Sequence, residues 1–452
     1  MEQGRLKTEK IPKLLLSLAL PAICAQIVTL LYNLVDRIYI GRMENGLLAM
    51  GAIGICAPVV TMVTAFTGLF GRGGSPLAAI HMGKGDNEKA EKYLGTSVGM
   101  LIITSILITG LVMGFKQPLL KLFGASEAIL PYGDDYMSIY CLGTVFVQLT
   151  VGMNYYITTQ GFAKTAMATT MLGGALNIVL DPLFIFTLKM GIKGAAIATV
   201  ISQLASFLWA ASFMLGKKTL LHVRISNLKP DLKILKEIVI LGSAPFFMNA
   251  SEGIMTICFN TQVQKFGGDT AVSAMTILFS VFQFMLLPVE GVAQGSQPII
   301  GYNYGAGEYG RVKEAIHLAL ISTLIFTMIG TTVVMICPES FIRIFNSSQE
   351  LIQLGSGMLR VYVVGMFVLG ANSTFQQTYN SLGEGGKAFF FAFYRKVIIL
   401  IPMLYVFPAV LPWGVMAVVL AEPVADLITT GTNALYFHRF IKKKLFTSAS
   451  PH

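Results

Sequence analysis

Long apolar runs limit what this chain can fold into. Residues 94–115, 165–188 and 192–215 are apolar almost throughout, and each run has about the twenty residues that an α-helix needs to cross a membrane. In lipid the backbone polar groups must bond within their own segment, which favours helices, and the alternating pattern of a transmembrane barrel is absent. Only 12% of the residues are charged, about half the share that is usual in a soluble chain. The sequence therefore predicts an all-α polytopic membrane protein.

Twelve transmembrane helices are expected, in two sets of six. The first set lies near residues 13–40, 48–80, 93–114, 132–157, 165–187 and 192–215, and the second near 236–264, 271–300, 313–336, 355–380, 388–409 and 412–438. The first run continues through Leu34, which is too long for the core of a signal peptide, so it is interpreted as a retained helix. These bounds predict an N-terminal lobe (1–215), a linker along the cytoplasmic membrane surface (216–236), and a C-terminal lobe with a basic tail (237–452).

The two sets of helices are similar to each other. Residues of the first half recur 222 positions later, since Gly133, Tyr140 and Gly143 correspond to Gly355, Tyr362 and Gly365. Because each half has an even number of helices, the repeats share one orientation and are related by an axis along the membrane normal. Substrate sites in such proteins lie where the halves face each other, so two pseudo-symmetric six-helix lobes with alternating access are expected.

The net charge of +10 is explained by membrane orientation rather than by nucleic-acid binding. With an even number of helices, the basic clusters fall on one side of the membrane. They are residues 5–13, 84–92, 217–236, 311–313, 387–396 and 439–444. The positive-inside rule then predicts that both termini lie in the cytoplasm. The chain is expected to be a multi-pass protein of the bacterial plasma membrane.

The cysteines and histidines do not indicate a cofactor or an enzyme. The five cysteines lie singly in apolar runs, and the five histidines form no zinc-ligand pattern. A membrane enzyme would need a convergent set of nucleophile, base or metal ligands, and no cluster of buried histidines is present. We therefore expect no enzyme activity and no cofactor other than a transported Na⁺ or H⁺.

Three of the predicted helices each carry oxygen-bearing residues at positions four apart, which share a helix face. The three pairs are Tyr32 and Asp36, Asn177 and Asp181, and Ala195 and Thr199. A charge at the centre of a membrane helix costs roughly 2.5–3.5 kcal/mol on insertion scales, so its presence suggests function. Two carboxylates with amide, hydroxyl and carbonyl oxygens suit Na⁺ or a proton. The alternatives are that Asp181 only caps or kinks its helix before Pro182, and that Asp36 pairs with Arg37.

These helices resemble the multidrug and toxic compound extrusion (MATE) family. The similarity lies in Tyr-Asn-x-x-Asp at 32–36, Asn-x-x-x-Asp-Pro at 177–182 and Gly-Ala-Ala-x-Ala-Thr at 194–199. The resemblance implies a cation or proton site in the N-terminal lobe. That site would comprise Asp36, Asn177, Asp181, Thr199 and the Ala195 carbonyl, with Tyr32 nearby; the first four would bind Na⁺ if the protein is sodium-coupled.

The C-terminal lobe has acids of its own. The resemblance places Glu252 at the substrate cavity, on a helix that also offers Met248 and Asn249 to an organic cation, and Glu290 is a further intramembrane acid. A packing role for Glu252 stays open, as does the role of Glu422 and Asp426. Some family members carry another carboxylate on the tenth helix, but residues 361–379 have none, so no cation site of that kind is expected.

The resemblance implies an antiporter that exports amphipathic organic cations in exchange for Na⁺ or H⁺. The other expected partner is membrane lipid, with no nucleic acid, and the protein is expected to be monomeric. The alternative is a flippase for a lipid-linked saccharide or peptidoglycan precursor. A flippase needs basic cavity residues for a pyrophosphate, whereas this cavity is expected to be mostly acidic.

Overall fold

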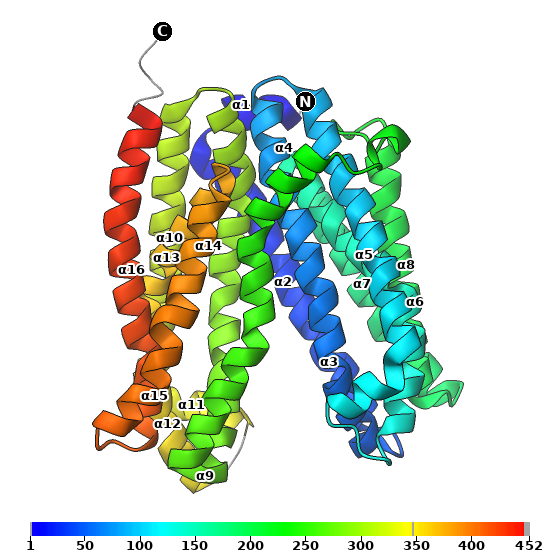
Figure 1. Cartoon of the computed structure of the whole chain (residues 1–452), viewed down its shortest axis with the longest axis vertical. Coiled ribbons are helices and arrows are strands. Elements are labelled where there is room, and N and C mark those ends of the chain that lie inside the picture. The colour runs from blue at the N-terminus through cyan, green and yellow to red at the C-terminus, as the bar shows by residue number, and fades with distance from the viewer. Residues whose placement is uncertain (1, 346–347, 447–452) are drawn as a thin grey trace.

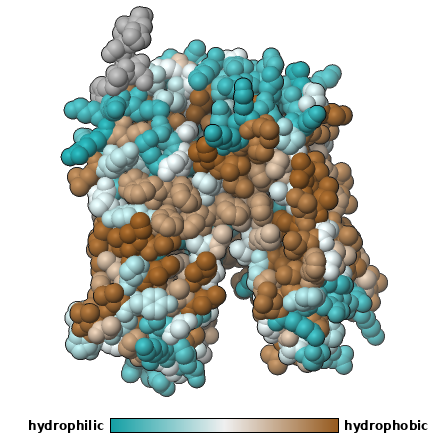
Figure 2. Space-filling view, viewed as in Figure 1, coloured by the Kyte–Doolittle hydropathy of each residue, from teal (hydrophilic) through white to brown (hydrophobic). Residues whose placement is uncertain are grey.

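The computed structural model is built of helices and describes residues 2–345 and 348–446. The helices form two arms that meet at the end carrying both termini and diverge at the opposite end (Figure 1). Apolar surface forms a broad band between polar ends, and the space between the arms is open at the end far from the termini (Figure 2). This distribution fits a chain that crosses a hydrocarbon layer.

The first arm contains the elements of the N-terminal half. They are α1 (Glu2–Thr8), α2 (Ile11–Gly41), α3 (Gly46–Thr67), η1 (Gly68–Arg72), α4 (Gly73–Gly83), α5 (Asn87–Leu122), α6 (Leu130–Thr159), α7 (Ala163–Pro182), η2 (Leu183–Thr187) and α8 (Gly191–Leu215). The segments η1 and η2 are short π-helical turns inside membrane helices. Turns of this kind are frequent at functional sites.

The second arm contains the elements of the C-terminal half. They are α9 (Leu232–Gly305), α10 (Tyr309–Ile336), α11 (Pro338–Phe345), α12 (Gln349–Val363), α13 (Met366–Ser381), α14 (Gly385–Phe393), η4 (Tyr394–Leu400), α15 (Ile401–Val410) and α16 (Val415–Phe446). The segment η4 is a third π-helical turn.

The predicted twelve transmembrane helices are confirmed within the described residues. Ten helices are long and apolar enough to span a membrane, and α12 with α13 forms an eleventh, broken span. The 74-residue α9 holds two of the predicted helices, because Gly268 interrupts it with a φ of 67°, a value that glycine adopts without strain.

The tenth helix, predicted near residues 355–380, is broken into α12 and α13. It is bent by 44° between Val363 and Met366. The cause is a close approach of α16, since a Cβ on Gly365 would lie 2.6 Å from the Pro423 Cα.

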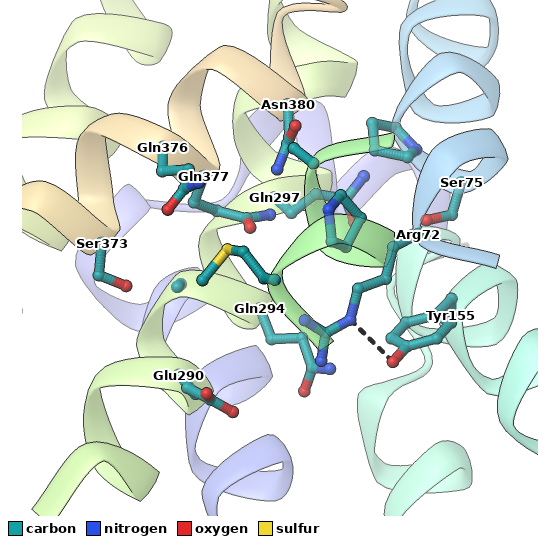
Figure 3. A pocket seen from close by; sticks show the side chains of 15 residues that line it. Arg72, Ser75, Tyr155, Glu290, Gln294, Gln297, Ser373, Gln376, Gln377 and Asn380 are labelled. Atoms are coloured by element: carbon teal, nitrogen blue, oxygen red, sulfur yellow. Dashed lines mark hydrogen bonds between the residues drawn. The ribbon is translucent and has the colours of Figure 1, made fainter. Parts of the chain in front are cut away.

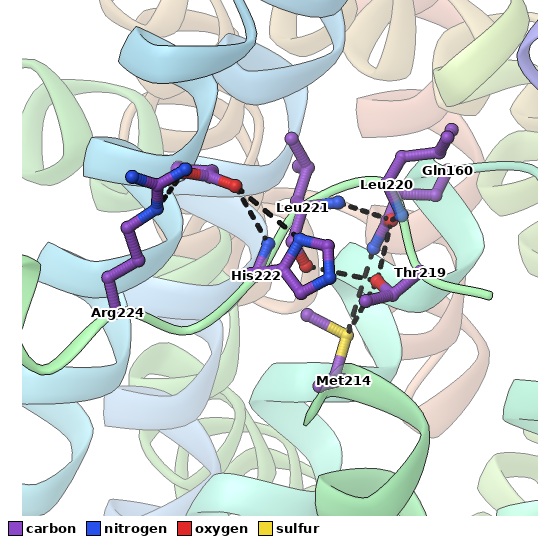
Figure 4. Close-up of polar contacts among 8 residues, drawn as sticks. Gln160, Met214, Thr219, Leu220, Leu221, His222 and Arg224 are labelled. Atoms are coloured by element: carbon purple, nitrogen blue, oxygen red, sulfur yellow. Dashed lines mark hydrogen bonds and ion pairs between the residues drawn. The ribbon is translucent and has the colours of Figure 1, made fainter. Parts of the chain in front are cut away.

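The linker is held against the N-terminal half. It includes the 3₁₀ turn η3 (Ile225–Asn227). The Gln160 Oε1, at the end of α6, accepts hydrogen bonds from the backbone N–H groups of Leu220 at 2.7 Å and Leu221 at 2.9 Å (Figure 4). The buried Glu91 of α5 forms an ion pair with Arg224, at 2.6 Å. These contacts fix the chain between the two arms to the first of them.

The two halves meet at the end that carries the termini. One apolar core there draws buried residues from both halves, whereas each half has a second core of its own farther along the arms. The backbones approach so closely that a Cβ on Gly83 would lie 1.9 Å from the Tyr302 carbonyl oxygen, and one on Gly305 would lie 1.9 Å from that of Ile80. We call these four residues the glycine seam. At the seam only hydrogen atoms separate the two halves.

Candidate functional site

The two acids of the N-terminal half lie together. Asp36 on α2 and Asp181 on α7 have carboxyl groups within hydrogen-bonding reach of each other. The Asn177 Nδ2 donates a hydrogen bond to Asp181 Oδ1 at 3.1 Å. Among the described residues, Asp36 Oδ1 and Asp181 Oδ2 are buried and accept no hydrogen bond. The structure thus brings three of the predicted site residues into one cluster. Two of its buried carboxylate oxygens lack a hydrogen-bond donor, and a proton or a bound cation would satisfy them.

Local packing explains why these side chains meet. The helices α2 and α7 lie against each other, and at Gly174 a Cβ would be only 3.2 Å from Tyr32 Cδ1. The small residue lets the helices approach closely. About one and two helical turns farther along α7, Asn177 and Asp181 share the face that is turned toward α2. Both are almost fully buried, with exposed fractions of 4% and 0%.

The remaining predicted members of the site lie around this pair. Tyr32 is close enough to interact electrostatically with Asp36 and also lines a cavity of about 360 Å³. Ala195 is fully buried on α8 and Thr199 is partly buried there, on a helix that packs against both α2 and α7. No hydrogen bond joins Ala195 or Thr199 to the two acids in the described structure. Their part in ion binding stays a prediction.

Sequence reasoning missed two aromatic neighbours of the acid pair. Tyr136 of α6 lies near both carboxyl groups, and Tyr140 lies near Tyr32. The two rings are stacked with centroids 5.8 Å apart. Their spacing of four residues in a predicted helix is a signal that could have identified them, since it places both rings on one face.

Within residues 2–345 and 348–446, no basic side chain forms an ion pair with Asp36 or Asp181, and Arg37 acts on Asp36 only from a longer distance. Among the described residues no ion pair joins Asp36 to Arg37, so that alternative is not supported. Two other acids, near the start of α6, do have basic partners: Lys116 lies 2.8 Å from Asp134, and Lys193 lies 3.2 Å from Asp135. The donors around Asp36 and Asp181 are hard oxygens, which fit Na⁺ or a proton as a transported ion.

The acids on the last helix of the C-terminal half have a basic partner inside the protein. Arg395 lies 2.6 Å from Glu422 Oε1 and 2.6 Å from Asp426 Oδ1. All three side chains are at most 14% exposed. Because Arg stays protonated in proteins, both carboxylates always have a counter-charge supplied by the protein itself. We call these three residues the Arg395 cluster.

Glu252 also has a basic partner. The Lys396 Nζ lies 3.0 Å from Glu252 Oε2 and donates hydrogen bonds of 3.0 Å to Ser251 Oγ and to the Met248 carbonyl oxygen. The Glu252 side chain is 75% exposed, whereas that of Lys396 is 8% exposed. Met248 and Asn249 line the cavities described below. Glu252 therefore both faces open space and pairs with a buried base.

The assignment of Arg395 and Lys396 to a cytoplasmic basic cluster is wrong. Both lie in η4, near the middle of the membrane span Gly385–Val410. Their nearness in sequence to Lys387 suggested a surface cluster. Acids from α9 and α16, which are distant in sequence, make their burial possible because a buried charge persists when it is paired.

A cavity of about 120 Å³ lies between the two halves and holds charges of both signs. The Arg72 guanidinium extends into it from the first half, and Glu290 lies on the wall formed by α9 (Figure 3). The Arg72 Nε donates a hydrogen bond to Tyr155 Oη at 2.8 Å. The expectation of a mostly acidic cavity is wrong, because it overlooked Arg72. The signal was a base within a predicted membrane helix, in Gly-Arg-Gly-Gly at 71–74.

Comparison with known proteins gives consistent results. The family model MatE matches the chain twice, at residues 21–183 and 245–406, once in each half. The multidrug export protein MepA of Staphylococcus haemolyticus (strain JCSC1435) is 24% identical over 92% of this chain and 91% of its own length. MepA of Staphylococcus aureus (strain NCTC 8325) is 24% identical over 92% of each chain.

Solved structures have the same fold. A multidrug resistance MATE family transporter of the MOP superfamily, in an outward-facing conformation, superposes with a TM-score of 0.91 at 23% identity and covers 98% of this chain and 99% of its own. A crystal structure of MATE in the bent conformation superposes with a TM-score of 0.93 at 23% identity over 99% of both chains.

Proposed function

The chain belongs to the MatE (multidrug and toxic compound extrusion) family, as its motifs predicted, and from this premise we propose that it exports amphipathic organic compounds in exchange for Na⁺ or H⁺. The observation that carries the proposal is the Asp36–Asp181 pair, two facing carboxyl groups inside a membrane protein with no basic partner among the described residues. Drug export is inferred from relatives that are named multidrug export proteins. The comparisons do not favour a flippase.

Ion binding would act through α2. Like charges in a poorly solvated site repel each other, and one bound cation between Asp36 and Asp181 relieves that repulsion. The same helix, one-half turn beyond Pro21, packs against α9 of the other half, where a Cβ on Gly291 would lie 2.2 Å from Ile23 Cγ1. A ligand shifts an equilibrium between two arrangements only by its difference in affinity for them. The helix that carries Asp36 is thus the element through which an ion would favour one arrangement of the halves.

The orientation in the membrane follows from the positive charges. With both termini in the cytoplasm of a bacterium, the end at which the arms diverge faces outward, and the glycine seam closes the inner end. The protein would work as a monomer, because the cavity is lined by both halves of one chain. Export of a compound without net charge against one inward cation would use about 2.3 kcal/mol for each 100 mV of membrane potential.

Transport in proteoliposomes tests the proposal. The vesicles hold a fluorescent organic cation, and a Na⁺ gradient or a pH gradient is imposed separately. We expect one gradient to drive movement of the cation in the wild type and Asp36→Asn to abolish the gradient-driven part. The matched control is Asp269→Asn, on the exposed turn after Gly268. Wild-type rates in Asp36→Asn, or no response to either gradient, would contradict ion coupling.

A further inference from the structure

We propose that the cavity between the halves binds a zwitterion, with Arg72 holding a carboxylate and Glu290 holding an ammonium group. This inference rests on the proposed export function and names the substrate class of that function. It differs from the expectation of a simple organic cation. The reasons are the placement of the two charges, their lack of strong protein partners, and the chemistry of the side chains around them.

Arg72 lies at the junction of two connected spaces. The 120 Å³ cavity and the 360 Å³ cavity are both lined by Arg72, Tyr155 and Gln294. Arg72 is the last residue of η1, and its side chain is exposed to this space rather than to a packed core. The guanidinium therefore forms part of the wall of both cavities.

The Arg72 guanidinium is positioned but only partly used. One hydrogen bond, from Nε to Tyr155 Oη, and a contact 5.3 Å from the centre of the Tyr155 ring hold it in place. No other hydrogen bond or ion pair of Arg72 occurs in the part of the chain that the structure describes. The terminal N–H groups remain available for the planar, two-point recognition that a guanidinium gives to a carboxylate. The charge is permanent because Arg is not deprotonated in proteins.

Glu290 supplies the opposite charge without cancelling the first. It lies one helical turn before Gln294 on α9, and it is near enough to interact electrostatically with Arg72. No ion pair joins the two, and Glu290 makes no hydrogen bond or salt bridge elsewhere among the described residues (Figure 3). Two opposite charges on facing walls, each open toward the cavity, are complementary to one ligand that carries both charges.

The rest of the lining fits the same ligand. Gln294, Gln297 and Gln377 offer amides that both donate and accept hydrogen bonds, and Met248 offers an adaptable apolar surface. A ligand with only an ammonium group would be repelled by Arg72 and would leave that charge without a partner, and a ligand with only a carboxylate would do the same at Glu290. Discrimination of this kind works by repulsion as well as by attraction.

Binding of three matched probes to the purified full chain tests the inference. Nε-dansyl-lysine is a zwitterion, its methyl ester is a cation, and its Nα-acetyl derivative is an anion, so the three share the dansyl group and differ mainly in charge. We expect the wild type to bind the zwitterion about tenfold more tightly than either of the others, which corresponds to one charge-assisted contact. Fluorescence titration in detergent measures each affinity.

The variants separate the two charges. Arg72→Gln is expected to lose about tenfold in affinity for the zwitterion and to bind the cation at least as well as the wild type. Glu290→Gln is expected to lose the same affinity and to bind the anion better. Arg360→Gln, an exposed arginine of α12 outside both cavities, is the matched control and should keep the wild-type order. Gain of affinity for the opposite probe cannot result from misfolding.

The outcomes distinguish this inference from the proposed function. Equal affinity of the wild type for the zwitterion and the cation, unchanged in Arg72→Gln, would overturn zwitterion recognition while ion-driven export of a cation still held. Absence of any gradient-driven transport together with the expected binding order would overturn export and leave the binding site in place.

Discussion

The two halves of the protein each bury a pair of carboxylates, and the pairs differ in one respect. In the N-terminal half Asp36 and Asp181 face each other with no basic partner among the described residues. In the C-terminal half Arg395 lies 2.6 Å from both Glu422 and Asp426. Because the positive charge of Arg395 belongs to the protein itself, the second pair is a fixed structural element. Under the proposed function the first pair takes its counter-charge from solution, so that one half would contribute ion exchange and the other stability.

The largest expected effect comes from breaking the Arg395 cluster. Arg395→Gln leaves two buried carboxylates uncompensated, which should lower the free energy of unfolding by about 3–5 kcal/mol. Thermal unfolding in detergent, followed by size-exclusion chromatography, measures the loss. The triple variant Arg395→Gln, Glu422→Gln, Asp426→Asn removes all of the charges and should recover most of it. Wild-type stability in Arg395→Gln would mean that the cluster does not hold the C-terminal half together.

Neutralising an acid of the N-terminal pair should lower transport rather than stability. Asp36→Asn or Asp181→Asn removes a repulsion and should leave thermal stability unchanged or slightly higher, yet it should lower gradient-driven transport at least about tenfold, because the ion loses a charged ligand. Stability and transport are measured on the same preparation. A loss of stability as large as that of Arg395→Gln would show that this pair, too, is structural.

Addition of the coupling ion should produce a smaller difference in stability between variants of the two acid pairs. If the ion is Na⁺, a concentration ten times the dissociation constant should stabilise the wild type by about 1.4 kcal/mol. Asp36→Asn should lose this effect, whereas the stability of the C-terminal triple variant should still respond. Thermal unfolding in NaCl against choline chloride gives the comparison. Equal stabilisation of Asp36→Asn would place the Na⁺ site elsewhere.

The smallest effect is expected at Lys396. Glu252 is 75% exposed, so the ion pair between them contributes little, and a glutamine can still donate to Ser251 Oγ. Lys396→Gln should therefore lower the free energy of unfolding by about 1 kcal/mol. The same chromatographic assay compares it with Lys265→Gln, a lysine on the segment before Gly268. If Lys396→Gln lowered the free energy of unfolding as much as Arg395→Gln does, the pairing of the exposed Glu252 would matter as much as that of the buried acids.

The sequence predicted the parts of the fold that depend on local pattern. The apolar runs located the membrane helices, and the spacing of Asn177 and Asp181 placed both on one face. Contacts between distant segments were not predictable in this way. The bend between α12 and α13 depends on Gly365 meeting Pro423, and the burial of Arg395 depends on acids of α16. Tyr136 joins the acid pair because α6 packs beside α7, which no residue pattern within α6 specifies.

The glycine seam has a consequence for trapping the protein in one conformation. A methyl group at Gly83 or Gly305 would occupy the position of a carbonyl oxygen in the facing half. Under the alternating access that we propose, alanine there would raise the energy only of the arrangement in which the end carrying the termini is closed, so it would shift the population toward the arrangement with the halves parted. A single added methyl group would thus populate the other conformation, which could then be studied structurally without any inhibitor or antibody.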